Sequence, residues 1–280
     1  MTLDDWLGAH AFLQPIARLR ARIDAAIDAA AMPHPAIPDW DDYRADFAAG
    51  VPLLHSADAD IDLGPAGCAA VALIHTLTTA TLDGAIAHDL PLLSAELPRD
   101  ERSARRVVDW LLGDESWTPS RAGSLRCVGW LTMAACLQPV VHAFAEWRDD
   151  DRWLRRYCPA CGSLPAMAQL VGVDPGRQRL LSCGCCGSRW RYGRTGCPFC
   201  EVESSRLASL GIDGEGGLRI DYCESCRGYL KTYDGHGAES VLLADWTSLH
   251  LDLAAGDRGL QRLAASLYDV VPVNHSSVPL

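Results

Sequence analysis

The chain contains four Cys-x-x-Cys pairs between residues 158 and 226, and this spacing constrains its fold more than any other feature. The pairs are Cys158/Cys161, Cys183/Cys186, Cys197/Cys200 and Cys223/Cys226. The third pair follows the first at almost the same offset as the fourth follows the second. One unit of nearly constant length therefore occurs twice, with two pairs in each unit.

Two thiols separated by two residues can point at one ion from a single tight turn. A second such turn, brought over by a hairpin, completes a tetrahedron of four sulfurs. Such a site suits Zn²⁺ or a single iron of rubredoxin type, so the expected cofactors are two metal ions, iron or zinc. The predicted ligands are Cys158, Cys161, Cys183 and Cys186 in the first unit, and Cys197, Cys200, Cys223 and Cys226 in the second.

Several alternatives to this pairing stay open. The pairs can interleave as in RING domains, and Cys185 can replace Cys183 or Cys186 as a ligand. Structural disulfides and redox-active dithiols are the remaining uses of such cysteines. The even offset of the repeat favours two separate four-cysteine sites.

The turns of the two units differ at the residue after the second cysteine. Gly162 and Gly187 occupy this position in the first unit, where glycine lets the backbone bend and direct N–H groups toward sulfur. Glu201 and Arg227 occupy it in the second unit. We therefore expect weaker metal binding or a more open turn there. Metal binding would also supply the stability that two such small units lack.

The rest of the chain has helical periodicity, which indicates an α+β protein in four parts. We expect an all-α domain at 1–154, two small rubredoxin-like or zinc-ribbon metal modules at 155–194 and 195–235, and a C-terminal helical segment at 236–280. A central buried helix is expected over 66–90 and another helix over 99–113. Over residues 120–154 we expect either one long kinked helix or two helices, with the break at Pro139. Further helices are expected over 238–256 and 258–268.

Composition narrows the class of protein. Apolar residues make up 49% of the 280 residues, and the formal net charge is −11. This charge disfavours sequence-independent binding to nucleic acid. The most apolar stretch is short and contains Pro139, so no membrane insertion is expected. The acidic N-terminus lacks a secretory signal, which favours the cytoplasm and reduced thiols.

The remaining reactive residue types form no recognisable catalytic pattern. Cys68, Cys127 and Cys136 lie in apolar helical stretches and are interpreted as buried small hydrophobes. The nine histidines are scattered, and none falls at metal-ligand spacing with another. Aromatic residues after the cysteine turns, Trp190 and Tyr229 among them, are expected to cover the metal units. The sequence therefore predicts a protein that is not an enzyme.

The cysteine segment also carries a family resemblance. The matching stretches are YCPACGSLP, RLLSCGCCGSRWRYGRTGCPFC, YCESCRGYLKTYD and ADWTSLHLDLAAGDRG, from Tyr157 to Gly259. They resemble the formate dehydrogenase accessory protein family, FdhE. The resemblance implies a cytoplasmic protein with a helical N-terminal domain and two rubredoxin-like modules. It also implies binding to the catalytic subunit of a respiratory formate dehydrogenase before that subunit is exported, and a link to iron.

Three functions follow as hypotheses. The first is an accessory protein or chaperone for the maturation of formate dehydrogenase. The second is a rubredoxin-like electron-transfer protein with another partner, since a thiolate-ligated iron passes one electron and zinc does not. The third is a zinc-ribbon module that binds nucleic acid. Residues 152–235 are compatible with this function because they hold 12 Arg and Lys against 8 Asp and Glu, a small positive excess. The oligomeric state is not predicted.

Overall fold

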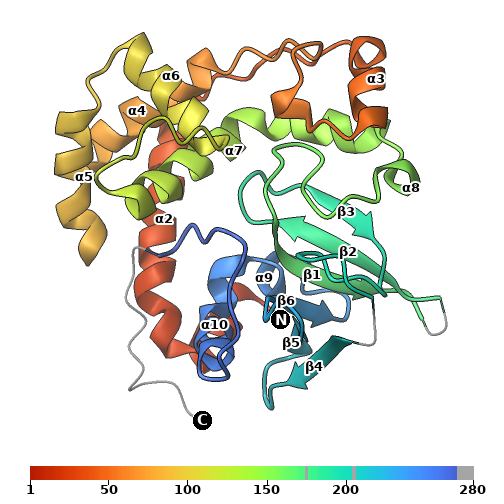
Figure 1. Cartoon of the computed structure of the whole chain (residues 1–280). Helices are drawn as coiled ribbons and strands as arrows, with labels where there is room; N and C mark the ends of the chain where they lie inside the picture. The colour runs from red at the N-terminus through yellow and green to blue at the C-terminus, as the bar shows by residue number, and fades with distance from the viewer. Residues whose placement is uncertain (174–175, 204–205, 270–280) are drawn as a thin grey trace.

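The computed structural model describes residues 1–173, 176–203 and 206–269. A group of helices lies beside a six-stranded sheet, and the C-terminal helices lie between α2 and the sheet (Figure 1). The helices are α1 (Leu3–Ala9), α2 (Gln14–Ala29), α3 (Trp40–Ala49), α4 (Gly64–Leu77), α5 (Ala85–Glu96), α6 (Glu101–Leu111), α7 (Ala122–Trp147), α8 (Asp150–Trp153), α9 (Glu239–Leu242) and α10 (Leu249–Gly256). Short 3₁₀ helices are η1 (Ala11–Leu13), η2 (Leu53–His55) and η4 (Asp245–Ser248).

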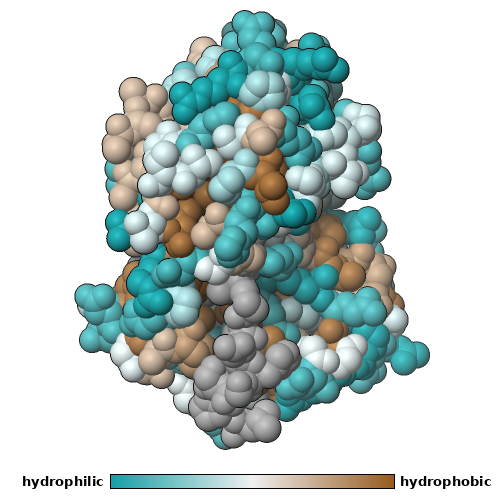
Figure 2. All heavy atoms as spheres, turned by 90° about the vertical axis from the view of Figure 1, so that its left-hand side faces the viewer, coloured by the Kyte–Doolittle hydropathy of each residue, from teal (hydrophilic) through white to brown (hydrophobic). Residues whose placement is uncertain are grey.

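The longest helix, α7, is the centre of the helical part. It packs against α2, α4, α5 and α6, and Pro139 lies inside it without breaking it. Among the described residues it is the one helix long and apolar enough to cross a membrane by length and composition. Its most apolar window is 61% buried inside the protein, as expected of a core helix. On the face shown in Figure 2, hydrophobic groups are interspersed among hydrophilic ones and form no continuous belt.

The helix expected over 66–90 is two helices, α4 and α5. The hydroxyl groups of Thr78 and Thr79 donate hydrogen bonds to the carbonyls of His75 and Thr76, at 2.7 and 2.9 Å. These contacts satisfy the carbonyls of the last turn and end α4. Gly84 then has φ of +78°, which lets the chain turn before α5 begins. The prediction of one helix was wrong because apolar composition masked this turn.

The helix expected over 258–268 is also absent. In its place an extended arm pairs with the turn before β6 (Tyr229–Asp234): Gln261 N–H donates to the Arg227 carbonyl at 2.8 Å, and Tyr229 N–H donates to the Gln261 carbonyl at 3.2 Å. Ion pairs of Arg262 with Asp245 and Asp252 hold the arm down. Helical periodicity in this stretch was overridden by these tertiary contacts.

The sheet joins the two cysteine units. Its strands are β1 (Pro165–Val171), β2 (Gln178–Cys183), β3 (Arg189–Tyr192), β4 (Leu207–Gly211), β5 (Leu218–Cys223) and β6. Their order is β3-β2-β1-β6-β5-β4, so each unit supplies three antiparallel neighbours. The units meet where β1 pairs in parallel with β6, with Met167 opposite Lys231. The two cysteine units are therefore halves of one sheet arranged head to tail.

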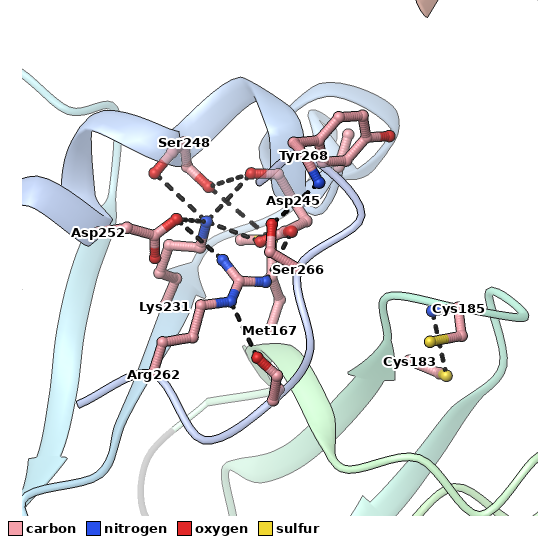
Figure 3. Close-up of polar contacts among 12 residues, drawn as sticks. Met167, Cys183, Cys185, Lys231, Asp245, Ser248, Asp252, Arg262, Ser266 and Tyr268 are labelled. Atoms are coloured by element: carbon pink, nitrogen blue, oxygen red, sulfur yellow. Dashed lines mark hydrogen bonds and ion pairs between the residues drawn. The ribbon is translucent and has the colours of Figure 1, made fainter. Parts of the chain in front are cut away.

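A buried ion-pair network fixes β6 to the C-terminal helices (Figure 3). Lys231 is only 1% exposed, and its Nζ lies 2.7 Å from Asp245 Oδ1 and 3.0 Å from Asp252 Oδ2. Arg262 contacts the same two carboxylates at 2.7 and 2.9 Å. Burial alone would raise the pKa of Asp245, but Lys231 and Arg262 outweigh it and lower the pKa to about 2. Asp245 is thus held as an anion between two basic side chains.

Replacing Lys231 by Met is expected to lower the free energy of unfolding by about 3–5 kcal/mol, because it leaves buried carboxylate charge with one cation fewer. Urea denaturation at neutral pH measures the effect. Arg44→Ala is the matched control, since the Arg44–Asp41 pair is exposed and is worth about 1 kcal/mol or less. Equal effects of the two variants would contradict this interpretation of the network.

Candidate metal centres

The first cluster of thiols forms where the loop before β1 meets the turn between β2 and β3. Its members are Cys158, Cys161, Cys183 and Cys186, and all four are buried. Their Sγ atoms lie within 4.8 Å of one another, with 3.5 Å from Cys158 to Cys186 and 3.5 Å from Cys161 to Cys183. The separations exclude disulfides, whose sulfurs lie about 2.05 Å apart.

The second cluster has the same construction around β4, β5 and β6. Its members are Cys197, Cys200, Cys223 and Cys226. Its closest sulfur pairs lie 3.8 Å apart for Cys197 and Cys226, and 3.7 Å apart for Cys200 and Cys223. An ion held tetrahedrally at about 2.3 Å from sulfur needs neighbouring sulfurs about 3.8 Å apart. Both clusters thus have the dimensions of a tetrahedral thiolate site for zinc or iron.

The structure groups the eight predicted ligands as the repeat suggests and without interleaving. Cys185 is buried but lies outside the first cluster. Its backbone N–H lies 3.4 Å from Cys183 Sγ, toward which it donates (Figure 3). The backbone N–H groups of Phe199 and Gly228 approach Cys197 and Cys226 in the same way, at 3.4 Å. These dipoles disperse the negative charge of thiolates. That the clusters bind metal stays a prediction.

All four cysteine turns have the same backbone conformation after the second cysteine. The φ angles are +74° at Gly162, +77° at Gly187, and +60° at both Glu201 and Arg227. The second unit therefore forms the same turn with residues that pay a steric penalty of about 1–2 kcal/mol each. The side chain of Arg227 offsets part of this cost by donating to the Arg258 carbonyl at 2.5 Å.

The two clusters differ in their exposure to solvent. In the second cluster Cys200 is exposed and Cys226 is partly exposed, whereas the first is covered by the helical part. Backbone N–H groups of Leu53 and Leu54 in η2 donate to the carbonyls of Pro159 and Ala160, both at 2.9 Å. The first cysteine turn is therefore fixed to the helices, whereas the second cluster is fixed to the C-terminal arm.

The thiols in each cluster strongly influence one another's protonation. Hydrogen bonds from the other thiols, Cys158 first, hold the pKa of Cys186 well below its ordinary value, and the hydrogen bond with Cys158 raises the pKa of Cys161. In the second cluster, burial raises the pKa of Cys226 to about 12, whereas at Cys223 burial is outweighed by backbone N–H groups, which lower its pKa to about 7. Each cluster thus contains a favoured thiolate beside thiols that release protons when a cation binds.

The other cysteines lie outside both clusters. Burial raises the pKa of Cys127 to about 12 and that of Cys136 to about 11, which fits the prediction of inert core residues. Cys68 is exposed, so the prediction that it is buried was wrong. It lies on α4, where it lines a groove shared with α6.

Sequence reasoning missed a third group of metal-ligand type. His10, Glu215 and His250 come together from the N-terminal edge of η1, the β4–β5 loop and α10. Their separation along the chain left no spacing signal, and only the tertiary fold could reveal them.

Chelators are expected to remove metal from the second cluster before the first, because Cys200 and Cys226 are accessible to solvent. Release should have a fast and a slow phase when metal-loaded protein is mixed with a chromogenic chelator. Cys200→Ser should abolish the fast phase and keep the slow one. Lower pH should speed release, because protons compete with the ion for each thiolate. A fast phase that survives Cys200→Ser would contradict this order.

Glu201→Gly is expected to raise the free energy of unfolding of metal-loaded protein by about 0.5–1 kcal/mol, because glycine tolerates φ of +60°. Glu224→Gly, in the next turn of the same cluster, is the matched control. Glu224 has no positive φ, so this change should destabilise the protein by about 0.5–1 kcal/mol. Denaturant titration compares them, and a loss of stability in both variants would refute the prediction.

Comparisons with known proteins agree with this architecture. No protein-family model matches the chain. A protein named FdhE homolog from Pseudomonas aeruginosa is 39% identical over 126 residues, which cover 40% of this chain and 39% of that protein. The Aquifex aeolicus homolog is 33% identical over 129 residues, 44% of this chain and 46% of its own. The matched segment thus spans less than half the length of these relatives.

A further relative and a solved structure extend the likeness. The FdhE homolog of Shewanella baltica strain OS195 is 30% identical over 184 residues, which cover 60% of this chain and 61% of that protein. The crystal structure of the FdhE protein from Pseudomonas aeruginosa superposes with a TM-score of 0.60 and 26% identity, over 89% of this chain and 86% of that one. The chain is therefore similar to FdhE proteins in both sequence and fold.

Proposed function

We propose that this protein is an accessory protein for formate dehydrogenase, which binds the catalytic subunit in the cytoplasm before that subunit is exported. The observation that carries the proposal is the pair of four-thiol clusters on one sheet, in a chain that is similar to FdhE proteins in sequence and fold. A rigid sheet of this kind offers a client a preformed surface. The proposal assigns the protein no reaction of its own.

The donor sets fit zinc or iron. Four thiolates per cluster would fill a tetrahedral coordination sphere and leave no position for a substrate, which is typical of structural or electron-transfer sites. Iron would add one-electron chemistry when bound, and zinc would add none. The surrounding backbone N–H groups stabilise thiolate charge in either case. The partial exposure of the second cluster makes it the one that a client is expected to approach.

An electron-transfer role with another partner is the second candidate. The exposed Cys200 favours it, since electron transfer to a partner needs a ligand atom near the surface. Nucleic-acid binding is not proposed. Several arginines that a phosphate-binding stripe would need already contact groups of the protein itself. Arg189 donates to Gln169, Arg156 donates to the Phe199 carbonyl, and Arg191 pairs with Asp151 at the surface.

Anaerobic affinity purification of tagged protein from a formate-grown cell extract tests the accessory role. The wild-type protein is expected to retain the catalytic subunit of formate dehydrogenase. Cys200→Ser/Cys226→Ser should retain several-fold less, because it removes two ligands from the exposed cluster. Cys68→Ser is the control, since it changes an exposed cysteine outside both clusters.

The outcomes separate the two candidates. Failure of the wild-type protein to retain this subunit would refute the accessory role. Absorption of an iron–thiolate centre in the same preparation, bleached reversibly by a reductant, would then favour electron transfer to another partner. Equal retention by the wild type and the double variant would show that the second cluster takes no part in client binding.

A further inference from the structure

Two histidines and a glutamate from three distant segments converge outside both thiol clusters. His10 precedes η1, Glu215 lies in the β4–β5 loop, and His250 lies on α10. We propose that these three side chains form a third metal site, for a divalent transition-metal ion such as Zn²⁺ or Fe²⁺. Two imidazoles and one carboxylate are a donor set that holds such ions and leaves coordination positions open.

The distances between the ligand atoms suit one ion. His10 Nε2 lies 3.3 Å from Glu215 Oε2, and His250 Nε2 lies 2.7 Å from the same oxygen. All three ligand atoms lie within 4.8 Å of one another. Nitrogen and oxygen ligands at about 2.0–2.2 Å from an ion are roughly 3–3.5 Å apart, so small side-chain shifts bring the group into range.

The hydrogen bonding of His10 leaves a place for a cation. Its Nδ1 lies 2.9 Å from the Trp6 carbonyl, which accepts only when Nδ1 carries the proton. Neutral His10 therefore has its Nε2 lone pair directed at the Glu215 carboxylate. Two electron-rich atoms held this close together need a cation between them, either a proton or a metal ion.

Packing holds the imidazoles in this arrangement. Trp6 stacks on His10 with ring centroids 3.8 Å apart, and Trp6 Nε1 donates to the Thr247 carbonyl at 2.9 Å. Phe12 contacts both histidine rings edge-on, at 5.7 and 5.2 Å. The carbonyl behind His10 and the aromatic rings around it resemble the outer shell that orients metal-binding histidines.

The three side chains also line a cavity of about 440 Å³. His250 is only 3% exposed, and its Nδ1 has no hydrogen-bond partner within the described part of the chain. Buried polar atoms of this kind are normally paired, so the cavity is expected to supply water or a bound ligand there. A three-ligand ion at this place would therefore have room for an exchangeable fourth ligand.

Metal stoichiometry tests the proposal. Full-length protein is equilibrated with excess Zn²⁺, passed through a desalting column and analysed by mass spectrometry of the metal. The wild type is expected to hold about three ions per chain, and His250→Gln and Glu215→Gln about two, because loss of a ligand weakens binding by roughly tenfold or more. His142→Gln is the matched control, since it changes an exposed histidine that pairs with Glu146.

Cobalt separates the three sites by their spectra. Co²⁺ at thiolate clusters has sulfur-to-metal charge-transfer absorption, whereas a site of nitrogen and oxygen ligands has only weak visible bands. The third equivalent of Co²⁺ should add weak bands alone in the wild type and in His142→Gln, and nothing in His250→Gln. Full charge-transfer absorption in the variant also shows that it has folded.

Two results would overturn the proposal. The first is a wild-type protein that saturates with two ions, which would mean that a proton on His10 bridges it to Glu215. The second is a third ion that persists in both His250→Gln and Glu215→Gln. If either variant fails to fold, Zn²⁺ beyond two equivalents should still raise the melting temperature of the wild type, and the absence of any rise would also reject the site.

Discussion

Four sulfur atoms packed 3.5–3.8 Å apart without a disulfide repel one another once they are deprotonated, so such a cluster of thiolates needs a cation to balance its charge. Everything in the two cysteine units is arranged around this requirement. Each cluster joins the loop before one strand to the turn after the next, so it closes the three-stranded unit at one end. A bound metal ion would add to the stability that each three-stranded unit obtains from packing.

The head-to-tail joining of the two units then sets their relation to the rest of the molecule. Parallel pairing of β1 with β6 places the first cluster toward the helical part and leaves the second toward solvent. Lys231 anchors the central strand to the C-terminal helices, and Trp6 ties the N-terminal helix to η4. Segments from the two ends of the chain thus meet over the second unit, where His10 and His250 lie beside the β4–β5 loop.

Local pattern was enough to predict the cysteine turns, their pairing and the helical character of the segment before them. Each of these rests on contacts within one helix or hairpin, or on a repeat that can be read directly. The joining of both units into a single sheet could not be predicted from the sequence, because no local signal specifies that β1 pairs with a strand of the other unit. The helix predicted over 258–268 was wrong for the same reason. The stretch has helical periodicity, but Arg262 pairs with Asp245 and the Gln261 backbone bonds to Arg227 and Tyr229, so the chain is extended there. Glu201 and Arg227 were recognised as unusual, although they adopt the same turn as the glycines.

Lys231 is the only lysine in the chain, and it is buried in the ion-pair network. The remaining basic side chains of fixed charge are all arginines, whose guanidinium groups do not react as primary amines. Reagents that attack primary amines therefore find no accessible lysine side chain. Amine-directed cross-linkers would therefore not couple a bound client to a lysine of this protein. Reagents that couple to carboxylates suit this purpose better, because the chain holds 36 Asp and Glu residues.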